Sequence, residues 1–121
     1  MMDLEATGPD GVRIRPAVPA DLIGVAELQV ASFTDRWSLE SVRQLAGLSG
    51  AIVLVAERSS NPTVLGYLIG QVVTDEAEIH SIAVAEAFRR RGIGCQLLLA
   101  FEGMALALGA ASAQGAADPP P

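Results

Sequence analysis

The sequence predicts an α/β fold in which a mixed, mostly antiparallel sheet is flanked by helices. Two observations predict it. Apolar, β-branched runs and segments of helical periodicity follow one another in the order β-α-α-β-β-β-α. Half of the 121 residues are hydrophobic, and only 4% are aromatic. This length and composition are typical of one soluble globular domain and not of a disordered or fibrous chain.

The N-terminal part is expected to be flexible up to the first strand. Residues 1–11 are polar and are interrupted by glycine and proline, which predicts a loose terminus. Residues 12–15 then alternate between apolar and charged side chains, as a half-buried edge strand does. This alternation places Arg13 and Arg15 on a solvated edge.

Two helices are predicted between the first and second strands. Residues 19–31 have apolar side chains at helical spacing, and proline and aspartate in the first turn suit the start of a helix. Residues 39–46 form a shorter amphipathic segment. Ser38, directly before it, has the side chain that commonly caps a helix N-terminus.

Three strands and a long helix are predicted to complete the fold. The strands cover residues 51–56, 64–73 and 78–84, which are apolar runs separated by turn-forming sequences. The helix covers residues 92–108. Residues 109–121 are rich in alanine, glycine and proline without strand or helix periodicity, which predicts a disordered tail.

The charge distribution limits the possible ligands. The net charge is −6, which argues against a general nucleic-acid binder, and the chain contains no lysine. Three of the eight basic residues are consecutive arginines, at 89–91, which indicates an anionic ligand at that position. The single cysteine fits a reducing compartment, and no export signal or membrane span is evident. We therefore expect a cytoplasmic protein without a membrane partner.

The most informative stretch is the strand 78–84 together with the start of the last helix. A short loop after the strand leads to Arg89, Arg90 and Arg91, and Gly92-Ile93-Gly94 then opens the helix. The first amides of a helix have no partner, and its dipole favours negative charge, so such a terminus can bind a phosphate. A Walker loop is excluded because it needs a lysine. A Rossmann fingerprint is excluded because position 97 is Leu97, where that motif needs a third Gly or Ala.

The residues of this stretch resemble motif A of the GNAT acetyltransferase superfamily. That motif reads Arg/Gln-x-x-Gly-x-Gly/Ala, which Arg89, Gly92 and Gly94 match, and Ser81 to Val84 resembles the family's fourth strand. The resemblance covers residues 12–108 and implies the GNAT fold and acetyl-CoA as cosubstrate. The cofactor-binding residues that it implies are Ile82, Ala83, Val84, Arg89, Arg90, Arg91, Gly92, Ile93, Gly94 and Cys95.

Within the superfamily the chain most resembles the RimI-type enzymes, which acetylate the N-terminal alanine of a ribosomal protein. Phe33 and Trp37 beside Ser38 are similar to their Phe-Pro-Trp-Ser segment, with two extra residues, and Asp75-Glu76-Ala77 is also similar. The resemblance implies acetyl transfer to an amine, and specifically to the N-terminal α-amine of a ribosomal or other protein. It also implies that Phe33 and Trp37 shape the acceptor site, although core or lid packing explains them equally well.

Family members continue beyond the last predicted helix into a further strand, helix and hairpin. The resemblance therefore implies that this C-terminal part of the fold, with the usual catalytic glutamate and tyrosine, is missing. The apolar strand 79–84 would then have an unpaired edge, which favours self-association. An alternative function follows, namely a truncated, catalytically inactive CoA-binding or interaction fragment. A third possible function is that of a phosphate- or nucleotide-binding module.

Two residues of the fourth strand are candidates for proton transfer. Glu78 lies where the histone acetyltransferase branch of the family has its general base, and a carboxylate desolvated by a ligand could serve as one. A solvated acid is the alternative. His80 would share a face with Glu78 and could relay a proton or be a packed side chain. Cys95 is interpreted as a small packing residue in the first helical turn, and no residue cluster suggests a metal.

Overall fold

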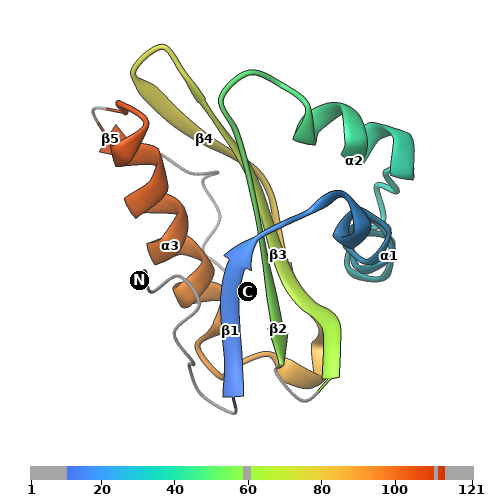
Figure 1. The fold of residues 1–121 in the computed structure, drawn as a ribbon. Helices are drawn as coiled ribbons and strands as arrows, with labels where there is room; N and C mark the ends of the chain where they lie inside the picture. Colours follow the sequence, from blue (N-terminus) through green and yellow to red (C-terminus); the bar gives the residue numbers. More distant parts are fainter. Residues whose placement is uncertain (1–10, 59–60, 111, 114–121) are drawn as a thin grey trace.

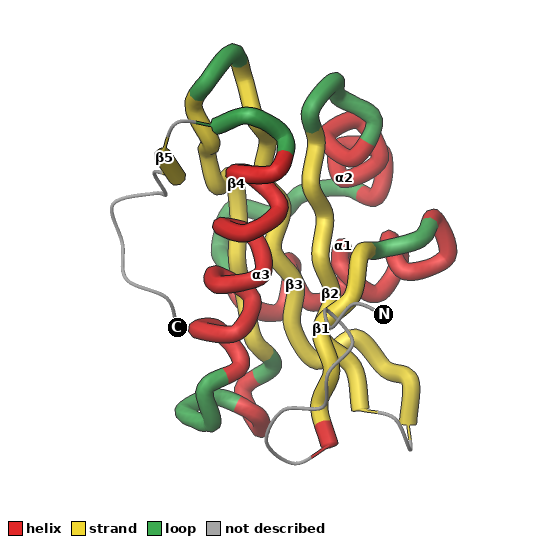
Figure 2. Tube along the Cα trace, turned by 60° about the vertical axis from the view of Figure 1, so that its left-hand side comes forward, coloured by secondary structure: helices red, strands yellow, loops and turns green. Residues whose placement is uncertain are grey.

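The computed structural model describes residues 11–58, 61–110 and 112–113, which form one sheet with helices on both faces (Figures 1 and 2). The predicted flexible segment before residue 11 lies outside these residues. The elements in chain order are β1 (Val12–Pro16), η3 (Pro19–Asp21), α1 (Leu22–Ser32), α2 (Leu39–Ala46), β2 (Ala51–Arg58), β3 (Asn61–Val73), β4 (Glu76–Val84), η4 (Glu86–Phe88), α3 (Ile93–Ala107) and β5 (Ser112–Ala113).

The sheet has the strand order β1-β2-β3-β4-β5. The first four strands are antiparallel neighbours, and only β4 and β5 are parallel. Helices α1 and α2 cover one face of the sheet and α3 covers the other (Figure 1). The predicted α/β class, with a mixed and mostly antiparallel sheet, is therefore confirmed. None of the helices in the described part of the chain is long and apolar enough to cross a membrane.

The two faces of the sheet carry separate hydrophobic clusters. On one face, Ile93, Leu97 and Phe101 of α3 pack into a cluster with side chains of all four long strands. On the other face, Val25 of α1 and Val42 of α2 belong to a second buried cluster. Each large apolar side chain buried in this way contributes about 1.5–3 kcal/mol, so these clusters hold the helices on the sheet.

The prediction of a disordered segment from residue 109 is wrong for residues 109–113 as far as they are described. Gly109 has a φ of 103°, which only glycine adopts easily and which turns the chain back from α3. Ala110 is 7% exposed, and its N–H donates to the carbonyl of Ala105 at 3.0 Å. Ser112–Ala113 then pairs with β4. So short a strand is fixed by its neighbour's backbone and needs no side-chain pattern. Residues 114–121 lie outside the described part.

The arginines of β1 also differ from their prediction. Arg13 and Arg15 both bond Glu57 of β2, at 2.7 and 2.9 Å, and Arg15 also bonds Asp21 at 2.8 Å. Both arginines are therefore part of an ion-pair network, and neither is a free, solvated side chain. The carboxylate of Glu57, which β2 holds beside β1, draws them together across the two strands. Sequence periodicity gave no sign of this partner.

Candidate functional site

A β-bulge in β4 shapes the centre of the site. Ser81 pairs with Ile69 of β3 and Ile79 pairs with Gly70, so His80 between them is an extra residue without a partner in the register. As a result Ile79 and Ile82, three residues apart, both pack toward α3. Glycine is required opposite the bulge, because a Cβ on Gly70 would overlap the ring of Phe101 and lie 2.7 Å from the carbonyl of Glu78.

After the bulge, the side chains of β4 point alternately toward α3 and toward α1 and α2. Ser81 faces α1 and α2, where its hydroxyl bonds the hydroxyl of Tyr67 at 2.7 Å within the buried cluster. Burial raises the pKa of the Tyr67 phenol, so the group stays protonated at neutral pH and can donate this bond. The bond fixes the strand in the register that exposes the next backbone groups at its outer edge.

The outer edge of β4 carries backbone groups that β3 does not use. The N–H of Ala85 donates to Leu65 of β3 at 2.7 Å. The alternation of an antiparallel ladder then directs the N–H and C=O of Ile82 and Val84 away from β3. On this side β5 pairs only with Glu76 and Ala77. From residue 78 to 84, no strand within the described residues lies beside this edge.

The N-terminus of α3 lies directly beyond the end of β4. Gly92 caps the helix with a φ of 85°, and a Cβ at this position would meet no protein atom within 4 Å. The first helical bond runs from Gln96 N to Gly92 O, so the amides of residues 93–95 have no partner inside the helix. These amides, with the positive end of the helix dipole, form an open site for an anion.

The three arginines before the helix have different surroundings. Arg89 donates from Nε to the carbonyl of Val84 at 2.8 Å and so ties the loop to the edge of β4. Arg90 is exposed with a φ of 66°, a conformation that costs about 1–2 kcal/mol for a residue other than glycine. Arg91 lies over the ring of Phe88, and Arg58 of β2 lies over the same ring. Arg58 thus joins the cluster, although the sequence gave no indication of it.

The two candidate proton acceptors lie on the face that α1 and α2 cover. Glu78 pairs with Gln71 of β3 and is exposed. The Nε2 atom of His80 lies 3.2 Å from Oε1 of Gln71, so both candidates lie beside the same glutamine. The structure therefore brings them to one face, as the regular alternation predicted, despite the bulge. In this state Glu78 is a solvated acid, and only a bound ligand could desolvate it.

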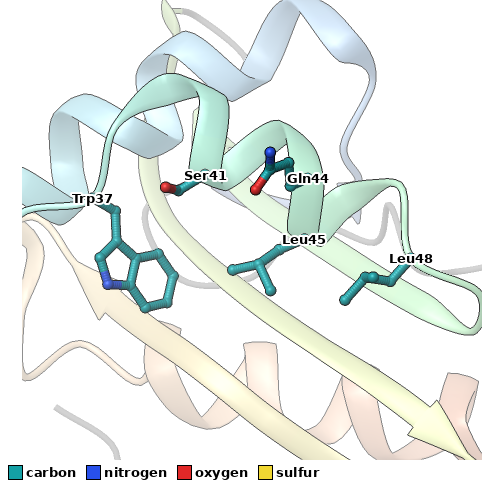
Figure 3. A pocket seen from close by; sticks show the side chains of 5 residues that line it. All are labelled: Trp37, Ser41, Gln44, Leu45 and Leu48. Carbon is teal, nitrogen blue, oxygen red and sulfur yellow. The ribbon is translucent and has the colours of Figure 1, made fainter.

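A groove of about 380 Å³ runs along α2 on the same face. Figure 3 shows Trp37, Leu45 and Leu48 pointing to one side of the helix, over the strands. Trp37 therefore lines this groove, and its role in an acceptor site stays a prediction. Phe33 does not line the groove and is 41% exposed.

A glutamine that sequence reasoning did not single out holds the loop before α2. Gln29 of α1 is only 2% exposed. Its side-chain amide donates to the carbonyl of Asp35 at 2.5 Å and accepts from the N–H of Trp37 at 2.8 Å. These two bonds fix Trp37 at the mouth of the groove. The sequence feature that could have indicated this role of Gln29 is its position: it is a polar residue on the otherwise apolar face of a predicted helix.

The remaining predicted site residue, Cys95, is exposed in the first turn of α3. Its interpretation as a packing residue is therefore wrong, because at this point of the turn Ile93 and Gly94 are the buried residues. Within the described part of the chain, His, Cys, Asp and Glu side chains form no group of three or more that could share a metal ion.

Comparison with known proteins assigns the family. The model of the acetyltransferase (GNAT) family matches residues 22–117, and the chain belongs to this family. No curated protein sequence matches the chain. GNAT enzymes use acetyl-CoA.

Solved structures show the same fold at low sequence identity. The ribosomal-protein-S18-alanine N-acetyltransferase from Escherichia coli superposes with a TM-score of 0.76 at 22% identity, over 86% of this chain and 65% of that enzyme. An aminoglycoside acetyltransferase from an uncultured soil metagenomic sample, in complex with sisomicin, gives 0.75 at 23%, over 89% and 78%. AAC(6')-Iy in complex with the bisubstrate analogue CoA-S-monomethyl-acetylneamine gives 0.75 at 16%, over 89% and 80%. The chain thus spans less than two thirds of the first of these enzymes.

Proposed function

We propose that this protein transfers the acetyl group of acetyl-CoA to an amine, and that the amine is the N-terminal α-amine of a protein. The observation that carries the proposal is the position of the open amides of α3 directly beyond the free edge of β4. A pyrophosphate bound at the amides would allow the pantetheine arm to run along that edge and pair with Ile82 and Val84. Because β4 ends at the helix terminus, one extended ligand can reach both.

Three residues at the helix start would hold the phosphates in this arrangement. Gly92 leaves space in front of the amides, and Arg90 is exposed in the same loop. Arg89 bonds the edge of β4 through Nε, which leaves its two terminal nitrogens for an anion. A solved structure of the same fold binds a CoA bisubstrate analogue, which supports CoA over a nucleotide such as ATP.

The chemistry of the groove supports a peptide acceptor. Its lining residues are uncharged and largely apolar, namely Trp37, Ser41, Gln44, Leu45 and Leu48. An aminoglycoside carries several ammonium groups, which acidic side chains would bind more favourably. A peptide N-terminus with small or apolar first residues has the shape and polarity that such a groove can accommodate. This favours the RimI-type acceptor over the aminoglycoside acceptor.

Proton removal from the amine falls to Glu78 and His80. An ammonium must lose a proton before its nitrogen can attack the thioester, and both side chains lie on the face that bears the groove. A bound acceptor would cover Glu78 and exclude water from its carboxylate. Direct attack by the amine is favoured over an acyl-enzyme, because no activating base is evident beside a serine or cysteine.

One observation favours a second function, a CoA-binding fragment without catalysis. The outer edge of β4 from residue 78 to 84 has no strand beside it in the described residues, so a bound pantetheine arm would be held from one side. Such a chain would bind CoA weakly and transfer no acetyl group.

Steady-state turnover separates these functions. We expect transfer to a peptide with a free N-terminal alanine, and little or none to its N-acetylated form or to sisomicin. Glu78→Gln should lower kcat about 100-fold with little change in the KM for acetyl-CoA, because it removes a proton acceptor and keeps the shape. Glu27→Gln, an exposed site on α1, is the control. CoA binding without transfer to any amine would support the second function, a CoA-binding fragment without catalysis. Transfer to sisomicin alone would overturn the proposal that the acceptor is a peptide N-terminus.

A further inference from the structure

Gln71 of β3 links the bulge of β4 to the loop that borders the groove. Its side-chain Nε2 donates to the carbonyl of Ser49 at 3.1 Å. Its Oε1 lies 3.2 Å from Nε2 of His80. Ser49 directly follows Leu48, which lines the groove. The amide of one side chain thus joins the groove side of the sheet to the unpaired residue of the bulge.

The direction of these bonds fixes the proton of the imidazole. A backbone carbonyl can only accept, so the amide nitrogen of Gln71 must face Ser49, and the amide oxygen must face His80. That oxygen carries no hydrogen, so the Nε2 atom of His80 has to be the donor. A neutral imidazole has a single N–H, and the lone pair therefore resides on Nδ1. Within the described residues, Nδ1 makes no hydrogen bond.

On the basis of the acetyl-transfer function proposed above, we propose that Gln71 is a positioning residue for catalysis. It holds the proton of the neutral His80 on Nε2 and leaves Nδ1 to take the second proton of the amine, the one that is lost as the nitrogen bonds the acetyl carbon, whereas Glu78 takes the first proton from the ammonium. The bulge supports this role, because His80 has no partner in the ladder and its ring would otherwise be held only by the strand.

The proton balance of the step agrees with this arrangement. The amine nitrogen bonds the acetyl carbon, the bond from that carbon to sulfur breaks, and CoA leaves as a thiolate. The first proton of the ammonium passes to Glu78 before the attack and from there to solvent. The second proton leaves the nitrogen after it has bonded the acetyl carbon, passes to Nδ1 and then to the thiolate, and so restores the neutral imidazole. In the intermediate imidazolium, Nε2 still donates to Gln71, since the amide oxygen accepts from either form. The hydrogen bond between Nε2 and Gln71 therefore persists throughout the step, so little reorganisation of the site is needed.

Nuclear magnetic resonance of the imidazole nitrogens tests the tautomer directly. His80 is the only histidine of the chain, so labelling with ¹⁵N-histidine gives a single pair of signals without assignment. In spectra recorded at about pH 8.5, we expect the proton on Nε2 in the parent. Gln71→Glu keeps an acceptor at this position and should keep the tautomer. Gln71→Leu removes the acceptor and should shift the signals toward a mixture of both tautomers.

Kinetics test whether the tautomer matters for transfer. Gln71→Leu should lower kcat about 10- to 100-fold with an unchanged KM for acetyl-CoA, and Gln71→Glu should restore most of it. A proton on Nδ1 in the parent overturns the inference, even if Gln71→Leu fails to fold. An unchanged kcat in a Gln71→Leu variant whose tautomer has shifted overturns the catalytic role. If the parent transfers no acetyl group, the proposed function fails, and the tautomer is still decided by the spectra.

Discussion

At the residue scale, the buried carboxylate of Glu57 is the clearest case of a residue whose role depends on its partners. It is 3% exposed and accepts hydrogen bonds from Arg13 and Arg15. The hydrogen bond from Arg15, more than any other interaction, holds the pKa of Glu57 below its ordinary value of 4.5, against the opposing effect of burial. The carboxylate therefore stabilises the fold at neutral pH.

Removing this charge should destabilise the protein in a pH-dependent way. Because the folded pKa lies below the unfolded one, the contribution of Glu57 is complete above about pH 4.5 and is lost as the pH falls through the folded pKa. Glu57→Gln should lower the free energy of unfolding at pH 7 by about 2–3 kcal/mol, less than for a fully buried pair because Arg13 is partly exposed.

Urea denaturation of both proteins between pH 3 and pH 7 measures this difference. The curves of parent and variant should converge toward the acid end. Glu27→Gln, at an exposed site on α1, should follow the parent throughout. A constant difference at every pH would show that the loss comes from packing and not from the charge.

Some residue roles were accessible to sequence reasoning, and others were not. Ser38 was predicted to cap α2, and its hydroxyl does accept the N–H of Ser41 at 3.0 Å, because capping is decided by neighbours in the chain. Glu57 and Gln71 find their partners 44 and 9 residues away, across strand pairs whose register only the fold determines. The sequence therefore predicted local contacts well and cross-strand contacts poorly.

At the element scale, β4 combines a predicted strand with an unpredicted irregularity. Its apolar run indicated a strand from residue 78, and the structure has it from Glu76 to Val84. The bulge at His80 lies opposite Gly70, where a Cβ would overlap the ring of Phe101 and the carbonyl of Glu78. A bulge of this kind depends on two elements at once, which a single periodicity cannot report. The same holds for β5, whose two residues are defined by the edge of β4.

The outer edge of β4 leads to a prediction about association. Unpaired N–H and C=O groups on an apolar strand are a template for a second chain. We expect this 121-residue chain to self-associate as its concentration rises. Saturating CoA should reduce the association, because the pantetheine arm would occupy the same edge. Sedimentation velocity over a range of concentrations, with and without CoA, measures both effects. A monomer at every concentration would show that this edge is protected.

At the scale of the whole molecule, the two faces of the sheet are covered by different helices, and the outer edge of β4 lies between them. Helix α3 covers one face and presents its N-terminus at the end of β4, while α1 and α2 cover the other face (Figure 1). The groove runs along α2. The proposed cofactor site and the groove along α2 therefore lie at different parts of the sheet. The order of elements and motif A could be predicted from the sequence, since both depend on contiguous residues. The groove could not, because its lining depends on the position that packing gives to α2.

Calorimetry of CoA binding to a Gly92→Val variant tests the central claim most directly. A Cβ at Gly92 meets no protein atom, so a valine would project into the open space before the amides of α3. The positive φ adds a strain of about 1–2 kcal/mol, so the unfolding free energy is measured alongside. Gly103→Val, at an equally open position within α3, is the matched control. We predict that the parent and Gly103→Val bind CoA alike and that a folded Gly92→Val loses at least about 100-fold in affinity, roughly 2.7 kcal/mol. Unchanged affinity in a folded Gly92→Val protein would contradict the assignment of the cofactor site.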